Sequence, residues 1–343
     1  MRETCQAVAV PLAPVVSSSP SATCPKKMVF GPCGGVRPDG GCEMVAMPCV
    51  FPALPELSDP GSLPRPVSAP LVLTDLSTPP ADAATLAATT RVLAPTCDAV
   101  LVGDHQDRPD FPPTLLARLV ADAGARPWVT LACRDRNRIV LEQELRGLRH
   151  DGLATVLCVT GDGRAFDVRP DVTQVFDLDG IRLAALASAI GLPVAVPETP
   201  TAPPVALRPA RLVQKQRAGA GIAVLNHVGS VTQVAAFMAA ARDAGLTIPV
   251  VASVAVYTDA RSANVLNALP GLEIEPATVR AVLASNDPVA AGIEAALAEA
   301  RALLGIAGVA GVNLSGMASD RGTAFAAAVQ AEIGQRLMAE FRR

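Results

Sequence analysis

The stretch VTLACRDRNRIVLEQELRGLRHDGLATVLCVTGD, residues 129–162, indicates the kind of unit from which this chain is built. An apolar run opens it, a charged loop and an amphipathic segment follow, and a second apolar run ends in Thr-Gly-Asp. Apolar runs of this length are typical of strands buried on both faces of a parallel sheet. The amphipathic segment predicts a helix that ends at Gly152, a residue type that favours helix C-termini. The stretch therefore predicts two strands joined by a helix.

The same alternation continues along the chain. Apolar runs of strand length lie at 71–77, 98–104, 127–135, 153–162, 191–198, 220–227, 248–256 and 307–316. Helical segments separate them, including 81–94, 136–152 and 231–245. Strands that alternate with helices in this number predict a (β/α)8 TIM barrel. A doubly wound sheet is the alternative, but it usually has fewer repeats, and no G-x-G-x-x-G motif follows the first strand.

Composition and charge narrow the function classes. The chain has 343 residues, half of them hydrophobic, and a formal net charge of −3 without runs of Lys or Arg. We therefore expect no nucleic acid and no membrane surface as a partner. No window has the roughly 18 uncharged apolar residues that a transmembrane helix needs. The opening MRETCQ lacks the basic region of a signal peptide, so we expect a cytoplasmic protein.

Residues 1–69 differ from the rest because they are rich in Pro, Ser, Gly and Cys and show no sustained period. The stretch FPALPELSDPGSLPRPVSAP, residues 51–70, contains Pro too often for a helix or an inner strand. We expect a small cysteine-rich module with a Pro-rich linker over residues 1–69. The barrel is expected over residues 70–343.

The module contains Cys24, Cys33, Cys42 and Cys49, four of the eight cysteines of the chain. Cytoplasmic cysteines stay reduced, which favours a metal site over disulfides. The spacing lacks a C-x-x-C pair and is a weak signal, but the glycines beside Cys33 and Cys42 let the backbone turn closely around a metal. Four thiolates suit structural Zn²⁺ or an iron–sulfur cluster. The alternative is a set of reduced cysteines in an unstructured leader.

In a TIM barrel, functional residues lie at the carboxyl ends of the strands. Polar residues follow the predicted strands at Asp75, Ser77, Asp104, His105, Arg134, Asp135, Thr160, Asp162, Glu198, Asn226, His227, Tyr257, Asn313 and Ser315. Because several of them directly adjoin apolar strands, we interpret them as the rim of a site. The alternative is that they are ordinary polar loop residues.

Three segments resemble the methylenetetrahydrofolate reductase family. CRDRNR and the strand ending in VTGD, within residues 129–162, resemble its third and fourth barrel units, and LVQKQRAGAGIAVLNHV (212–228) resembles its lysine-containing helix and next strand. CPKKMVFGPCGG (24–35) and DGGCEM (39–44) are similar to the cysteine-rich, C-terminal-type module of some bacterial members, here placed ahead of the barrel. The resemblance implies a TIM barrel that reduces 5,10-methylenetetrahydrofolate to 5-methyltetrahydrofolate, with NAD(P)H as hydride donor and a flavin (FAD or FMN) as cofactor.

The resemblance also implies roles for residues that match the family's motifs. It implies that the cofactor is bound by Thr130, Thr160, Gly161, Asp162 and Lys215. It implies that the substrate is bound by Asp162, Glu198 and Asn226, with the Asp162 carboxylate accepting hydrogen bonds from the pterin edge. On the residues alone, Asp162 is a turn or helix-cap aspartate and Lys215 a solvated helix lysine.

Three positions depart from the family pattern. Leu76 stands where the family has its general acid, and Asp75, one residue away, is the carboxylate left for that catalytic role beside Asp162. Since one residue reverses the face of a strand, we expect Asp75 to need a bulge or a strand-end turn. Thr130 replaces a flavin-contacting histidine, and Thr160 an arginine.

These departures leave other functions open. One alternative is a non-reductase barrel that binds a folate or a corrinoid partner without flavin chemistry. Another is a metal-stapled barrel with an unrelated substrate. The lysines of the module would suit a docking partner or electron entry, and the sequence allows a homo-oligomer.

Overall fold

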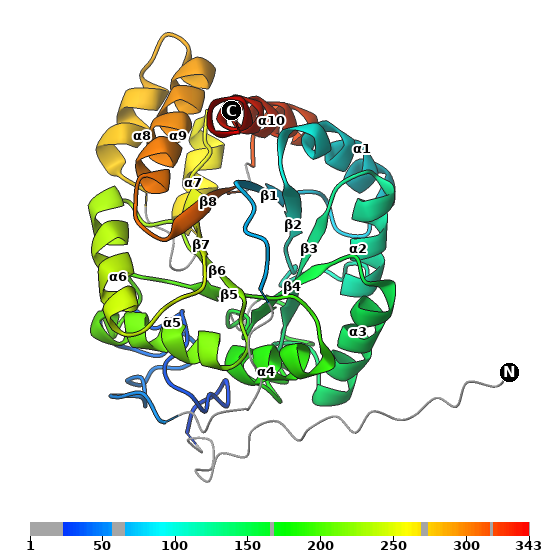
Figure 1. Ribbon diagram of the computed structural model, residues 1–343, viewed down its shortest axis with the longest axis vertical. Helices are drawn as coiled ribbons and strands as arrows, with labels where there is room; N and C mark the ends of the chain where they lie inside the picture. Colours follow the sequence, from blue (N-terminus) through cyan, green and yellow to red (C-terminus); the bar gives the residue numbers. More distant parts are fainter. Residues whose placement is uncertain (1–22, 57–65, 165–167, 269–273, 316–317, 343) are drawn as a thin grey trace, which may run out of the picture.

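Eight parallel strands close into a barrel in the order in which they occur in the chain (Figure 1). The computed structural model describes residues 23–56, 66–164, 168–268, 274–315 and 318–342. The strands are β1 (Val72–Leu76), β2 (Ala99–Val102), β3 (Pro127–Ala132), β4 (Thr155–Val159), β5 (Val194–Glu198), β6 (Ile222–Leu225), β7 (Val250–Val254) and β8 (Val309–Leu314). Each lies within an apolar run of the sequence, so the predicted (β/α)8 barrel is confirmed.

The helices form a ring around the barrel (Figure 1). They are α1 (Ala83–Leu93), α2 (Pro113–Asp122), α3 (Arg138–Asp151), α4 (Gly180–Ile190), α5 (Arg208–Arg217), α6 (Val231–Asp243), α7 (Ala260–Ala268), α8 (Pro276–Leu283), α9 (Pro288–Leu304) and α10 (Thr323–Phe341), with short 3-10 turns η1 (Ala94–Thr96) and η2 (Val205–Leu207). Helices α7, α8 and α9 all lie between β7 and β8. No helix in the described ranges is long and apolar enough to span a membrane.

The predicted strand–helix–strand unit has the expected helix ends. The side chain of Asn137 accepts a hydrogen bond from Val140 N and begins α3. Gly152 follows α3 in the left-handed conformation, with φ 71°. Glycine adopts this conformation without the steric cost that a Cβ would bring, so it ends the helix and frees the chain to enter β4.

Successive side chains of a strand point to opposite faces of the sheet, so the apolar side chains form one cluster inside the barrel and one outside it. The inner cluster fills the barrel and includes Leu73, Leu101, Trp128 and Leu157. The outer cluster lies between the strands and the helices and includes residues one position away, such as Val72 on β1. Buried apolar area on both faces of the sheet is the main source of stability for such a fold.

The chain crosses the middle of the barrel before it enters β1 (Figure 1). Val67 and Ala69 pack against the inner cluster. A Cβ at Gly311 of β8 would lie 1.8 Å from the carbonyl oxygen of Pro70, so only glycine fits at this crossing. The segment therefore completes the core of the barrel.

The part of the cysteine-rich module that the structure describes, residues 23–56, lies against α4 and α5 (Figure 1). Residues 1–22 and 57–65 of the expected 1–69 segment lie outside the described residues. Val29 and Phe30 of the module pack with Ile181 of α4 in one buried cluster. The backbone N–H of Val29 donates a 2.9 Å hydrogen bond to Asp179, the N-cap residue of α4.

Polar contacts attach the module to α5. Arg208 donates to the carbonyl of Cys33 at 2.8 Å, and Arg211 donates to the carbonyl of Phe30 at 2.9 Å. Gln214 donates to the carbonyl of Pro55 at 2.6 Å. These hydrogen bonds explain why α5, a strongly polar helix, has buried guanidinium groups, since buried polar groups need partners.

Candidate functional site

A cavity of about 290 Å³ opens at the carboxyl ends of β2 to β6. Nine of the predicted rim and site residues of the barrel line it, namely Asp104, Thr130, Arg134, Thr160, Gly161, Asp162, Glu198, Lys215 and Asn226. Lys26 and Cys33 of the module line it as well, so the module forms part of its wall. Residues that are far apart in the sequence therefore meet where a TIM barrel has its site.

Asp162 lies in the loop after β4. Gly161 has φ +92°, and Thr160 accepts a hydrogen bond from the backbone N–H of Gly180, which fixes the loop to the start of α4 at 2.9 Å. Gln106 donates to the Asp162 carboxylate at 3.3 Å. Burial raises the pKa of Asp162, the charge of Glu43 adds to this, and the charges of Lys26 and Arg134 oppose it.

Two module residues contact the backbone of this loop. Lys26 Nζ donates to the carbonyl oxygen of Gly161 at 2.7 Å and forms an ion pair with Glu43. The Glu43 carboxylate accepts from the backbone N–H of Gly163 at 3.1 Å. Burial raises the pKa of Glu43, but the Lys26 charge outweighs it, so this pKa lies below its ordinary value.

Glu198 ends β5 and is surrounded by cations of α5. Lys215 Nζ lies 2.9 Å from its carboxylate, and Arg208 Nη1 lies 3.6 Å from it. Burial raises the pKa of Glu198, but Lys215, Arg211 and Arg208 outweigh this effect and leave it lowered. Burial lowers the pKa of Lys215 to about 8, although Glu198 opposes the shift. Three cations beside one carboxylate give this wall an excess of positive charge that suits an anionic group.

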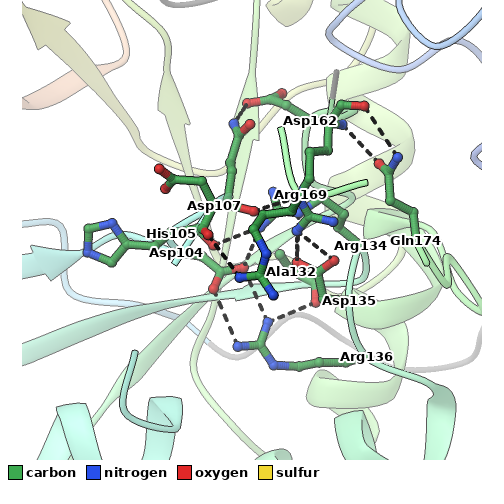
Figure 2. Close-up of polar contacts among 12 residues, drawn as sticks. Asp104, His105, Asp107, Ala132, Arg134, Asp135, Arg136, Asp162, Arg169 and Gln174 are labelled. Carbon is green, nitrogen blue, oxygen red and sulfur yellow. Dashed lines mark hydrogen bonds and ion pairs between the residues drawn. The ribbon is translucent and has the colours of Figure 1, made fainter. Parts of the chain in front are cut away.

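An ion-pair network continues along the rim from β2 to β4 (Figure 2). Arg134 is buried and reaches Asp135 at 2.8 Å and Asp104 at 3.4 Å. Arg136 pairs with the same Asp104 at 3.2 Å, and Arg164 pairs with Asp135 at 2.9 Å. The sequence singled out Asp104, Arg134 and Asp135 only as rim residues, and the signal for the network is the run of charges after β3.

A second cavity of about 310 Å³ adjoins the first. Asp104 and Thr130 line both cavities, and Arg136 and Arg164 line the second one. The space at the strand ends is therefore larger than the first cavity alone.

Asp75 points into the barrel near its β7–β8 side. Asn313 of β8 donates a 3.0 Å hydrogen bond to its carboxylate. Leu76 belongs to the outer cluster, so alternation alone turns Asp75 inward. The pairing of β1 with β2 is regular through both residues, so no bulge redirects Asp75. As far as the described residues define the 290 Å³ cavity, Asp75 is not part of its wall.

Cys24, Cys33, Cys42 and Cys49 line one small pocket in the module and are free thiols. Burial raises the pKa of Cys33 to about 11, although Lys26 opposes the shift. In the ranges that the structure describes, no three His, Cys, Asp or Glu side chains are arranged as a metal site. The metal therefore stays a prediction, and its support is that the four cysteines gather in one place.

Fold and cavity define this protein as a TIM barrel with a polar site at its strand ends. The chain belongs to the methylenetetrahydrofolate reductase family, because the model of the family described as "Methylenetetrahydrofolate reductase" matches residues 87–326. The model described as "Methylene-tetrahydrofolate reductase C terminal" matches residues 2–59, so a C-terminal-type module does precede the barrel. Both matches confirm the family that the sequence motifs indicated.

The fold is similar to that of solved structures. An uncharacterized protein from Clostridium thermocellum that binds two copies of 5-methyl-5,6,7,8-tetrahydrofolic acid is 12% identical, with a TM-score of 0.60 over 78% of this chain and 96% of that one. Tryptophan synthase from M. tuberculosis is 14% identical, with a TM-score of 0.41 over 78% of this chain and 90% of that one. No curated protein matches the sequence.

Proposed function

We propose that this protein reduces 5,10-methylenetetrahydrofolate to 5-methyltetrahydrofolate, with hydride from NAD(P)H passed through FAD or FMN. The observation that carries the proposal is that the same cavity is lined by Thr130, Asp162, Lys215 and Asn226. Membership of the family supports it, and a reduced folate is the ligand named for one structure of similar fold.

The lining of the cavity supports a bound flavin. Leu157 and Val196 give it apolar surface, and Arg211 and Lys215 give it positive charge on one side. A flat ring with an anionic tail suits such a combination, and ligand pockets commonly measure about 300–1,000 Å³, a range that the two adjoining cavities reach together. Thr130, Thr160, Gly161, Asp162 and Lys215 would hold the flavin. When bound, the flavin supplies the hydride-transfer chemistry.

The chain's own residues bind and orient the folate. The ionised Asp162 carboxylate accepts hydrogen bonds from the N–H groups of the pterin edge. Asn226 donates one hydrogen bond to Thr199 at 2.9 Å, and its carbonyl oxygen and second N–H remain to contact the ligand. We assign to Glu198 the task of holding Lys215 in place, because cations already surround its carboxylate.

Ring opening of the bridged substrate needs a proton, and we assign the general acid to Asp75. It is the carboxyl group at the end of β1 that points into the barrel, and Asn313 orients it. As the described residues define it, the wall of the 290 Å³ cavity does not include Asp75, so this role requires the substrate to reach beyond that wall toward Asn313. Replacing Asp75 by Asn should abolish turnover and leave ligand binding intact, and unchanged turnover would remove it from the mechanism.

A second candidate function is a barrel that binds a folate or a corrinoid partner without flavin chemistry. The observation that favours it is Leu76, which stands at the position of the family's acid and faces the helix layer. The absorption spectrum of the purified protein separates the two proposals. A bound flavin supports the reductase, and a colourless protein that binds 5-methyltetrahydrofolate but takes up neither FAD nor FMN supports the second candidate.

We also propose that Cys24, Cys33, Cys42 and Cys49 hold Zn²⁺ or an iron–sulfur cluster, which would make the module a site for electron entry or for a docking partner. Four thiolates complete such a site, and a metal promotes their deprotonation. Elemental analysis should find zinc or iron in the purified protein. Cys42→Ser should lose it, whereas Cys97→Ser, at a buried cysteine of the barrel, should keep it. Equal metal content in both variants would contradict the assignment.

A further inference from the structure

The module contacts the β4–α4 loop on both sides of Asp162. Lys26 Nζ donates to the carbonyl oxygen of Gly161, the residue before Asp162, at 2.7 Å. Gly163, the residue after it, donates its backbone N–H to Glu43 at 3.1 Å. Lys26 therefore binds the backbone carbonyl before Asp162, and Glu43 binds the backbone N–H after it.

Lys26 and Glu43 form one unit. They make an ion pair, and their side chains are only 3% and 13% exposed. Buried ion pairs with further hydrogen bonds have well-defined geometry, because each charge must keep its partners. The loop between them has glycine at both contact positions, and glycine gives a backbone little conformational preference. The loop thus relies on outside contacts for its conformation.

We propose that Lys26 and Glu43 are positioning residues that hold the loop so that the Asp162 carboxylate faces the cavity. The inference rests on the proposed role of Asp162 in folate binding. It makes the cysteine-rich module a part of the folate site, since two of its side chains hold the backbone on both sides of Asp162.

Electrostatics around Asp162 agrees with this arrangement. The charged groups that face it are Lys26 and Glu43 of the module and Arg134 after β3, and Gln106 donates to it. Lys26 lines the same cavity and stabilises the ionised form of Asp162. Loss of the Lys26 charge should therefore raise the pH at which Asp162 protonates.

The test compares Lys26→Met, Lys26→Arg and Lys27→Met in the full-length protein. Lys27 is a matched control, because it is adjacent and also donates to a barrel carbonyl, that of Val175 at 2.9 Å, but its side chain is 55% exposed. The dissociation constant for 5-methyltetrahydrofolate is measured by calorimetry as a function of pH. We expect Lys26→Met to weaken binding about tenfold. In this variant the affinity should also begin to fall at a higher pH as the solution is acidified. Lys26→Arg should restore most of the affinity, and Lys27→Met should match the wild type.

The proposal would be overturned if Lys26→Met and Lys27→Met bound 5-methyltetrahydrofolate with equal affinity and lost that affinity at the same acidic pH. Glu43→Gln serves if Lys26→Met does not fold, because its amide oxygen still accepts from Gly163 while the ion pair is lost. It should weaken binding less than Lys26→Met, and an unchanged affinity would again count against the proposal.

A second readout separates this proposal from the function itself. Hydrogen exchange of the Gly163 amide, followed by mass spectrometry, needs no ligand. Glu43→Ala should accelerate it relative to the wild type, and Lys27→Met should not. If the wild-type protein binds no folate, the proposed function fails, but accelerated exchange still supports the loop contact. Unchanged exchange in Glu43→Ala overturns it.

Discussion

Glu198, the last residue of β5, lies 2.9 Å from the ammonium group of Lys215 on α5, with its side chain 1% exposed. Arg208 of the same helix approaches Glu198 at 3.6 Å and donates to the carbonyl of Cys33 in the module. A single buried carboxylate thus connects a strand end, a helix and the module beside the cavity.

Glu198→Gln should destabilise the protein strongly. It leaves Lys215 and Arg208 buried without their counter-charge, and removal of one partner from a buried pair costs about 3–5 kcal/mol. Denaturant unfolding measures the change. Asp320→Asn is the control, because the Arg261–Asp320 pair is exposed and such pairs contribute about 0–1 kcal/mol. Similar losses in both variants would show that the Glu198 cluster is not a structural centre.

Binding of anionic ligands should depend on pH through Lys215. Burial lowers its pKa to about 8, so its ammonium group loses the proton as the pH rises through this value. Affinity for FMN should therefore be higher one pH unit below this pKa than one unit above it. Lys215→Arg stays charged over this range and should flatten the profile. An equally steep profile in the variant would assign the titration to another group.

Asp162→Asn should weaken binding of 5-methyltetrahydrofolate about 10- to 100-fold, since a hydrogen bond to a charged group contributes about 1.5–3 kcal/mol. Burial raises the Asp162 pKa, so wild-type affinity should fall as the pH drops, beginning above the ordinary aspartate value of about 4. The affinity of Asp162→Asn should not fall in this way as the pH drops. Asp171→Asn, at an exposed aspartate between β4 and α4, is the control and should retain the fall of affinity at low pH. If the affinity of Asp162→Asn still falls at low pH, another group is the source of the pH dependence.

Gly311→Ala should destabilise the barrel by about 3 kcal/mol or more, because its Cβ would meet the Pro70 carbonyl and the crossing segment would have to move. Gly103→Ala is the control, since no atom lies within 4 Å of its Cβ position. It should change the free energy of unfolding by less than about 1 kcal/mol. Equal stability of both variants would mean that the crossing segment is loosely packed.

The sequence predicted the barrel because strand and helix patterns are local. Buried apolar runs and a helix end such as Gly152 act within a few residues of each other, so their spacing is visible in the chain. Thr160, Gly161 and Asp162 could be placed on the rim for the same reason, since each follows a strand directly.

Contacts between distant segments could not be predicted in this way. Lys26 and Gly161 are 135 residues apart, and no local pattern indicates that they meet. On the residues alone Lys215 could be a solvated helix lysine, yet it is buried and its ammonium group contacts Glu198 at the end of β5. Asp75 shows a further difficulty, because a strand pattern predicts that Asp75 and Leu76 lie on opposite faces but not which of the two side chains faces the inside.

The proposed reduction is tested by the product formed from 5,10-methylenetetrahydrofolate under anaerobic conditions, with FAD or FMN and with NADH or NADPH. We expect 5-methyltetrahydrofolate in an amount equal to the nicotinamide oxidised, and we expect this product to be lost in Asp162→Asn. Folate binding without any such product, under every combination of flavin and nicotinamide, would contradict the reductase and leave a folate-binding barrel.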